Sequence, residues 1–553
     1  MATRPIREPR APLGSVLMRP IEWAHGQSLR LLEWFNQERW TLALTLLALV
    51  LANLVVLLFF LQERDNLAIA FVILLFAVIV VFLYVEIGIV LFLGAGAGLF
   101  VHSMYYALGS QGTQTGGRAI VLALFAVLTV RALYEYVRLA PEDRPRLSQP
   151  IIIAVFAFWA YYMIHIAYIY IFNMDKEPIS SPEQVLGYQK SKLFRYHDYH
   201  AYWIALPVLY ILLREYPRFR RVLLGLGVVM MLGVITLVWE YYAPLPQFWK
   251  VVFQLQAAGE TLEGYRVRNP ASLYLFLIGY FAAFYLLGYV RGYSVALIVA
   301  YVILATLGIL ITKNRILWAG ILVILPFALL LKPAPVLWRQ LVVGAIIMVV
   351  FAAFMLHPAI NEAVTKIYSE ALERWERNFA FGGDPRNDGS YQFRVREKEA
   401  WDVRYANLTA SQKLFGAGLE AQYGFYVSLS DAGYKGPRFS KLYYEKTHMH
   451  FAWLARLFQI GIVGTALLAL CFVVYFVRSI QAFLVASDPL LKGVILGIFG
   501  ATVGVLSFDM LHTLLPRDPA LPVIALWSVT ELVFHWSKRN EKNEKDDKYR
   551  QIQ

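Results

Sequence analysis

The chain has 553 residues, of which 59% are hydrophobic and only 16% are charged, whereas soluble proteins average about 25% charged residues. Its apolar residues occur in runs of about 20, the length that a helix needs to cross the hydrocarbon core of a bilayer. The composition therefore excludes a soluble globular protein and predicts a polytopic membrane protein. The net charge of +13 could indicate nucleic-acid binding, but no basic, aromatic-rich domain is present to carry it, so we expect no nucleic-acid partner. We attribute the charge to cytoplasmic loops and to contacts with anionic lipid headgroups of the bilayer.

Residues 1–40 form a basic segment that we interpret as a cytoplasmic tail with no signal peptide before the first span. Apolar spans are then predicted at 41–61, 67–84, 87–107, 119–139, 150–173, 201–213, 222–240, 271–290, 294–311, 316–331, 341–357, 451–477, 493–512 and 520–535. The span at Ala201 is short and could start earlier, within 197–200. The predicted fold class is an all-α polytopic membrane protein with roughly 12–14 transmembrane helices, as a bundle over 41–357 and a C-terminal group over 451–535. The charged tail 536–553 is expected to be cytoplasmic and disordered.

The basic residues of the connecting loops orient these spans. If the N-terminus is inside, the following residues fall inside as well: Arg138, Arg144, Arg146, Arg214, Arg218, Arg220, Arg221, Arg291, Lys332, Arg339, Arg478 and Lys492. This arrangement follows the positive-inside rule and leaves both termini in the cytoplasm. The polar segments 174–200, 241–270 and 358–450 then face outward.

The segment 358–450 is the longest polar stretch, and we expect it to form a mostly helical cap on the periplasmic side. It contains an amphipathic stretch at 369–377, a turn region rich in Gly, Asp and Asn at 382–389, and a second helix from about Tyr391 to Tyr405. A turn at Gly416–Gly418 follows. The cap ends where apolar sequence resumes at Phe451.

Several arginines fall on the outer side, against the positive-inside bias. Arg315 lies in the turn 312–315, because the apolar run from 294 to 331 is too long for a single crossing. It either extends to the membrane interface or faces the bundle and holds an anion, since its planar fork matches phosphate oxygens. Arg266 and Arg268 could contact headgroups or a ligand. On a helix only one of the two would point at a ligand, unless the segment is extended.

Two further arginines, Arg394 and Arg396, belong to the helix predicted in the cap. The charges of such a helix are usually solvated and paired four residues apart. These two become candidates for ligand binding because the cap has to fold over the membrane face.

The histidines His448 and His450 stand where the cap meets the next span, a position suited to proton transfer near neutral pH. They could instead pack at the interface, or join the segment His197–His200 in a metal site. We expect no metal, because the single cysteine, Cys471, excludes a Cys-based site and no helical histidine pair is present.

Asp509 and His512, with Arg517 soon after, form a polar group at the outer end of the penultimate span, which is functional or simply ion-paired. The sequence contains no P-loop, nucleophile elbow or zinc-protease motif. Energy coupling through nucleotide hydrolysis is therefore not supported.

Together these residues resemble the O-antigen ligase and O-antigen polymerase superfamily of bacterial membrane glycosyltransferases, over 264–464. In that family a long periplasmic loop ends in a His-Asn pair, followed about eleven residues on by Gly-x-x-Gly. His450 stands at that distance from Gly461, and Gly464 completes the pattern, whereas Phe451 replaces the Asn. This spacing favours His450 over His448.

Three weaker motifs follow the same order as in the family. The family's Thr/Ser-x-Ser-Arg turn is matched by Thr312 and Arg315, with Asn314 in place of the Ser. The family's Arg, Trp and Gly-x-Gly series is similar to Arg394 or Arg396, then Trp401 and Gly416–Gly418. A segment ending in Asn-Pro is similar to 266–270, with its glycine spacing off by one.

The resemblance implies a metal-independent, inverting glycan transfer at the periplasmic face of the bacterial inner membrane, without a cofactor. The donor would be a glycan linked to undecaprenyl diphosphate, and the acceptor a saccharide or lipid A core hydroxyl. His450 would be the general base and Arg315 would stabilise the leaving diphosphate. Arg266, Arg268, Arg394, Arg396 and His448 would bind the diphosphate and the glycan. The family includes ligases, polymerases and enzymes that glycosylate proteins, and the sequence does not separate them. A transporter or flippase for an anionic lipid-linked saccharide is the alternative.

Overall fold

The computed structural model describes residues 81–96, 115–171, 197–243, 256–261, 264–268, 270–311, 321–358 and 361–369 (both with single-residue gaps), 389–418, 421, 423–428, 441–446, 452–509 and 521–552. The chain divides into two compact units, one of residues 1–79 and 134–144, the other of residues 80–133 and 145–553. In the first unit, the described part is the end of one helix and the turn after it. There the Arg144 guanidinium donates to the Leu139 carbonyl (3.1 Å) and lies over the Tyr136 ring.

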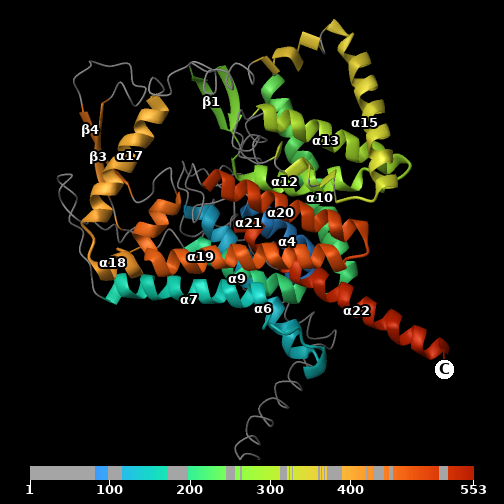
Figure 1. Ribbon diagram of the computed structural model, residues 1–553, viewed down its shortest axis with the longest axis horizontal. Helices are drawn as coiled ribbons and strands as arrows, with labels where there is room; N and C mark the ends of the chain where they lie inside the picture. The colour runs from blue at the N-terminus through green and yellow to red at the C-terminus, as the bar shows by residue number, and fades with distance from the viewer. Residues whose placement is uncertain are drawn as a thin grey trace, which may run out of the picture. The chain divides into compact units, whose positions relative to one another are not determined.

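The described elements of the chain are mostly helices (Figure 1). The helices are α4 (Val85–Gly96), α6 (Thr115–Arg138), α7 (Pro150–Ile171), α9 (His197–Leu212), α10 (Tyr216–Tyr242), α12 (Pro270–Leu286), α13 (Tyr293–Ile311), α15 (Ala334–Met355), α17 (Gly389–Ala406), α18 (Ala410–Phe415), α19 (Ala452–Val485), α20 (Pro489–Asp509), α21 (Leu521–Ala525) and α22 (Trp527–Ile552), with the 3-10 turn η1 (Pro141–Asp143). The strands are β1 (Gln256–Thr261), β2 (Gly264–Arg268), β3 (Tyr423–Ser428) and β4 (Lys441–Lys446).

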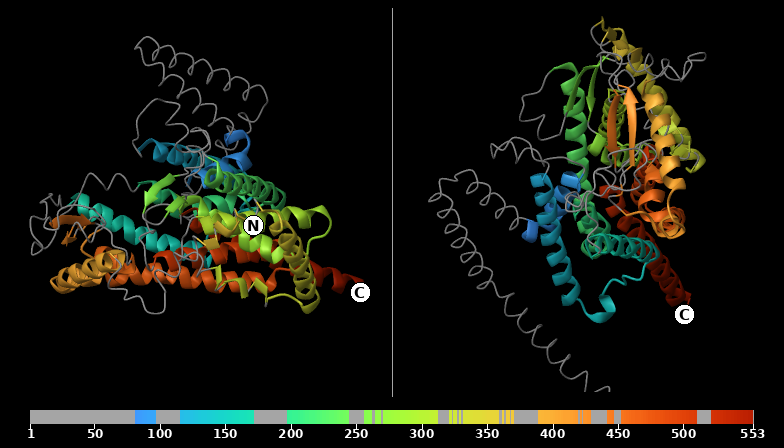
Figure 2. Two further views of the ribbon diagram at one scale, coloured as in Figure 1. Left: turned by 90° about the horizontal axis from the view of Figure 1, so that it is seen from above. Right: turned by 90° about the vertical axis from the view of Figure 1, so that its left-hand side faces the viewer.

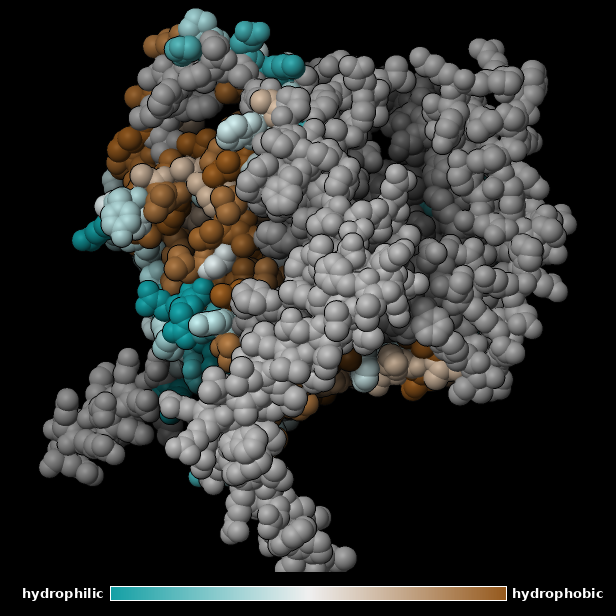
Figure 3. All heavy atoms as spheres, turned by 180° about the vertical axis from the view of Figure 1, so that it is seen from behind, coloured by the Kyte–Doolittle hydropathy of each residue, from teal (hydrophilic) through white to brown (hydrophobic). Residues whose placement is uncertain are grey.

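The prediction of a helical membrane protein is confirmed. Within the described ranges, 5 helices are long and apolar enough to cross a membrane, and they lie in α7, α10, α13, α19 and α20. The described helices match the predicted spans in order, and α9 begins at His197, inside the segment where the short span could start. Apolar side chains stay exposed along α10 and α15, for example Leu224 and Met348. Figure 3 shows apolar side chains gathered on one face of the described part, as a surface in contact with lipid requires.

The second unit is held together by pairs of helices that pack along their length. α12 packs along α20, and α7 packs along α19, which can be followed in Figure 2. Between α19 and α22 the rings of Tyr475 and Trp527 stack with centroids 4.4 Å apart, and the Phe472 ring meets Trp527 edge-on at 5.3 Å. The Trp527 indole donates to Thr502 at 3.1 Å, so the one polar atom of that ring is satisfied in the core.

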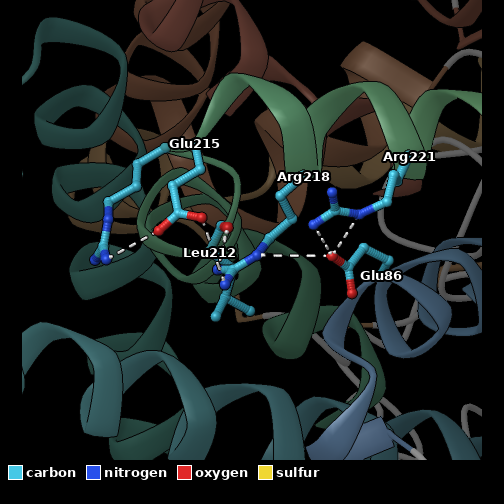
Figure 4. A network of polar contacts seen from close by, with 6 residues as sticks. Glu86, Leu212, Glu215, Arg218 and Arg221 are labelled. Carbon is cyan, nitrogen blue, oxygen red and sulfur yellow. Dashed lines mark hydrogen bonds and ion pairs between the residues drawn. The ribbon is translucent and has the colours of Figure 1, made fainter.

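Polar contacts join segments that the positive-inside rule assigns to the same side. The Glu86 carboxylate of α4 accepts hydrogen bonds from Arg221 at 3.0 and 2.7 Å and pairs with Arg218 at 4.0 Å (Figure 4). The Tyr216 hydroxyl donates to Asp488 at 2.6 Å. Each contact joins the start of α10 to another predicted inner segment.

A buried ion pair joins α19 to α22 near the side of the molecule that is predicted to be inside. Arg478 of α19 donates to the fully buried Glu531 of α22 at 3.0 and 2.9 Å. The other oxygen of Glu531 accepts from the Ile151 amide at 3.1 Å, so the carboxylate also caps the first turn of α7. Three helices are tied together by one acidic side chain.

Two features differ from the sequence-based prediction. The chain is not purely α-helical, because β1–β2 and β3–β4 form two antiparallel hairpins. The tail predicted to be disordered is helical, since α22 continues to Ile552. The physical reason is its charge pattern. Glu541 and Glu544 each precede a lysine by four residues, the spacing and order that support a helix.

Candidate functional site at the junction of the cap and α19

The sequence-predicted site residues are only partly described by the structure. His450, His448 and Arg315 lie outside the described residues, as do His512, Arg517 and the amphipathic stretch 371–377. The backbones of Arg266 and Arg268 lie in β2, and those of Arg394 and Arg396 lie in α17. The segment that contains His450 is bounded by two described elements, because β4 ends at Lys446 and α19 begins at Ala452.

α19 is broken at Gly461, one of the two glycines whose spacing singled out His450. Its backbone there has φ 68° and ψ −174°, a conformation that is essentially restricted to glycine. The segment 452–460 is therefore a separate first piece of the helix. A break leaves backbone carbonyls without their intrahelical donors, and buried carbonyls need other partners.

The turn Gly416–Gly418 supplies two of these partners. The Ala417 amide donates to the Phe458 carbonyl at 2.8 Å, and the Gly418 amide donates to the Gln459 carbonyl at 2.9 Å. Gly416 has φ 97°, and a β-carbon there would lie 2.6 Å from the Ile460 α-carbon. The two glycine motifs that the sequence suggested separately are in direct contact.

Local sequence explains why the cap chain reaches α19 in this way. α18 begins with a capping box, in which the Thr409 side chain accepts from the Gln412 amide and the Gln412 side chain accepts from the Thr409 amide. It ends at Phe415, and the amide of the C-cap residue Gly416 donates to the Gln412 carbonyl at 2.7 Å. α18 packs against α19 (Figure 1). The residues 416–418 that follow α18 therefore lie at the break in α19.

α17 presents a buried polar face at the same junction. Glu397, Trp401 and Arg404, spaced four and three residues apart, share one face of the helix and are buried. The Trp401 indole donates to the Leu454 carbonyl of α19 at 3.0 Å, and its ring stacks on Tyr405 at 4.6 Å. α17 also packs against β3, so the hairpin supports it from the cap side.

α19 contributes Arg456 and Gln459, both 4% exposed, and the Arg456 guanidinium donates to the Gln459 side chain at 2.8 Å. Glu397, Arg404, Arg456 and Gln459 each make further specific interactions. The described part of the junction thus buries one carboxylate and two guanidiniums, and buried charges persist in proteins when they are partnered.

Sequence reasoning missed Glu397, Arg404 and Arg456. It expected the charges of the cap helix to be solvated and paired four residues apart, which is correct for Lys398 and Asp402, paired at 2.7 Å and half exposed. The burial of Glu397 and Arg404 could have been predicted from their spacing around Trp401, which places all three on one helical face. By helical spacing, backbone position 394 falls in line with positions 397, 401 and 404, and position 396 does not.

The conformation of β2 shows that positions 266 and 268 can lie on the same side of the chain. The segment is extended, and it pairs antiparallel with β1 in the register Ala258 to Arg266 and Gln256 to Arg268. Alternate positions of a strand lie on one face, so positions 266 and 268 share a face, which a helix would not allow. The strand also contacts α10.

Among the described residues, no three His, Cys, Asp or Glu side chains converge into a metal site. The metal-free prediction still concerns His448 and His450, which lie outside those residues. Asp509 is the last residue of α20. No protein-family model matches this sequence, and comparison with curated proteins finds no match.

Proposed function

We propose that this protein transfers a glycan from an undecaprenyl diphosphate carrier to a sugar hydroxyl, at the periplasmic face of the bacterial inner membrane. The acceptor is a saccharide chain or a lipid A core, as in the O-antigen ligases and polymerases that the sequence resembles. The reaction inverts the configuration at the anomeric carbon and uses no metal or cofactor.

Each residue in the proposed site answers a chemical need of this reaction. The acceptor hydroxyl attacks the anomeric carbon, its proton passes to His450, and the bond from that carbon to the diphosphate oxygen breaks. The leaving diphosphate gains negative charge, which needs fixed cations when no metal is present. Arg315 and the arginines at 266 and 268 supply them, and His448, Arg394 and Arg396 contact the diphosphate or the glycan.

The observation that carries the proposal is the contact between two motifs far apart in the sequence. The Gly416–Gly418 turn of the cap packs on the break at Gly461, in the helix that begins two residues after His450. The glycine spacing that identified His450 thus has a structural cause that involves the cap. Rigid support next to a general base is what positioning of a reacting hydroxyl requires.

The test is a transfer assay with purified protein, an undecaprenyl diphosphate glycan and candidate acceptors. Lengthening of the glycan indicates a polymerase, and a shifted lipid A core indicates a ligase. We expect His450→Ala to lower the rate by about 10²–10⁴-fold while donor binding persists, because only proton transfer is lost. His357→Ala is the matched control, since His357 is exposed and precedes the cap.

A second arm uses Arg315→Lys, which keeps the charge but removes the bidentate fork. Low activity in this variant supports phosphate contact, and activity near wild type supports a snorkelling arginine. A fully active His450→Ala protein would remove His450 from the mechanism. Donor movement across the bilayer without any new glycosidic bond would favour a flippase instead.

A further inference from the structure

Tyr161 of α7 joins the cap to the broken helix α19. Its hydroxyl lies 2.9 Å from the Phe415 carbonyl oxygen and 2.8 Å from the Ile460 carbonyl oxygen, and donates its hydrogen to this pair. Phe415 is the last residue of α18, and Ile460 is the last residue before the break at Gly461. One side chain therefore contacts the ends of two helices, from a third.

Both carbonyls stand at positions where a helix supplies no donor. The last carbonyls of a helix have no intrahelical partner, and the break makes Ile460 such a position inside α19. The Ala417 and Gly418 amides bind the two carbonyls that precede it, at Phe458 and Gln459. Tyr161 completes this series, so three successive carbonyls at the break all accept hydrogen bonds from outside the helix.

The tyrosine ring also explains the second glycine of the motif. A β-carbon at Gly464 would lie 2.5 Å from the Tyr161 Cε1 atom, so the ring occupies the space that a larger residue would fill. His165, one turn further along α7 and 8% exposed, packs against the same ring with centroids 4.8 Å apart. The ring therefore lies close to both α19 and His165, which restricts the direction of its hydroxyl.

We propose that Tyr161 is a positioning residue, whose hydroxyl holds the first piece of α19 against the cap and thereby sets the place of the segment ending at His450. The catalytic part of this inference rests on the proposed glycan transfer. The structural part does not, because it concerns only the hydrogen bonds at Phe415, Ile460, Ala417 and Gly418. Tyr161 acts through other residues and need not touch a substrate.

The test compares Tyr161→Phe with Tyr301→Phe. Tyr301 is a matched control, because its buried hydroxyl also donates to a helix carbonyl, that of Phe276 at 2.9 Å, but between α13 and α12. We expect Tyr161→Phe to lower kcat by about 10- to 100-fold with KM unchanged within about twofold, since small displacements of a reacting group have effects of this size. Hydrogen exchange at the Ala417 and Gly418 amides should accelerate by about 2- to 10-fold, the factor that one net hydrogen bond represents.

Each outcome decides the proposal. Unchanged kcat and unchanged exchange at 417 and 418 would overturn it, and so would a loss of thermal stability without any change in the kcat of the folded protein. If the wild-type protein makes no glycosidic bond, the proposed function fails, and the exchange measurement alone decides whether Tyr161 holds the junction. If Tyr161→Phe does not fold, Gly464→Ala displaces the ring while keeping the hydroxyl. This variant should then accelerate the same two amides, and normal exchange there would refute the proposal.

Discussion

At the scale of single residues, Lys332 is unusual because it is a lysine buried outside the predicted spans. It lies in the turn before α15 and is only 7% exposed. Its ammonium donates to the Phe284 carbonyl at 3.2 Å and to the Gln340 side chain, and it lies 5.0 Å from the centre of the Tyr285 ring. These contacts favour the charged form, but desolvation is the larger effect, and burial lowers the pKa of Lys332 to about 7.

This shifted pKa predicts how stability depends on pH. The unfolded lysine, with its ordinary pKa of 10.5, binds a proton between pH 7 and 10.5 that the folded lysine has already lost. Stability therefore rises with pH through this window, and the contribution of Lys332 is least favourable below pH 7. We expect Lys332→Met to flatten the rise of melting temperature with pH, by about 2–4 °C between pH 7 and 9.

The measurement is thermal unfolding in detergent across that pH range, with Lys366→Met as the control because Lys366 is exposed. An unchanged pH slope in Lys332→Met would show that another group causes the dependence. A flattened slope in Lys366→Met as well would show that the effect is one of overall charge.

The sequence predicted which residues form the junction only where those residues belong to a recognised motif. Trp401 and the glycines at 416, 418, 461 and 464 belong to motifs, and the structure brings them together. Arg404 and Arg456 belong to none, and both are buried. Their burial depends on a contact between the cap and α19 that no local pattern encodes.

At the scale of elements, the long apolar helices in the described part of the chain follow the predicted spans in order, because runs of apolar residues specify spans strongly. The hairpins were missed. β2 contains two arginines that suggested a headgroup contact, and β3 pairs with β4 across twelve intervening residues. Pairing of distant short strands is a tertiary property. The break in α19 was also not predicted, although both glycines of its motif were noted.

The break gives a prediction at this scale. Gly461→Ala should destabilise the protein by roughly 1–3 kcal/mol, because φ 68° with ψ −174° is strained for alanine. A β-carbon would also lie 2.6 Å from the Phe415 carbonyl carbon, so the cap turn would have to move. Thermal unfolding in detergent measures the loss.

Gly227→Ala is the control for that variant, since a β-carbon at Gly227 in α10 meets no atom within 4 Å. Alanine in a helix is favoured over glycine, so this variant should be neutral or slightly more stable. Equal stability of the two variants would mean that the Gly461 conformation carries no strain.

At the scale of the whole molecule, the polar contacts separate into two sets. Glu86 with Arg221 and Tyr216 with Asp488 join segments predicted to be inside, and Arg478 with Glu531 joins such a segment to the inner half of the predicted span 520–535. The Trp536 indole adds another such contact at the Arg214 carbonyl, 2.9 Å away. The contacts of the cap with α19 join a segment predicted to be outside to the outer half of the predicted span 451–477. A wrong alternation of spans would instead pair residues from opposite sides.

The orientation itself can be tested by cysteine labelling. Arg220 and Ala410 are both exposed, and an odd number of predicted spans separates them, so they should lie on opposite sides of the membrane. The natural cysteine, Cys471, is buried and donates to the Ala154 carbonyl at 3.3 Å, so it should not react. A membrane-impermeant maleimide should therefore label Ala410→Cys in right-side-out vesicles and label Arg220→Cys only after permeabilisation. The reverse pattern would invert the topology and place the cap, with the proposed reaction, in the cytoplasm. Labelling of both positions from one side would show that an even number of spans separates them.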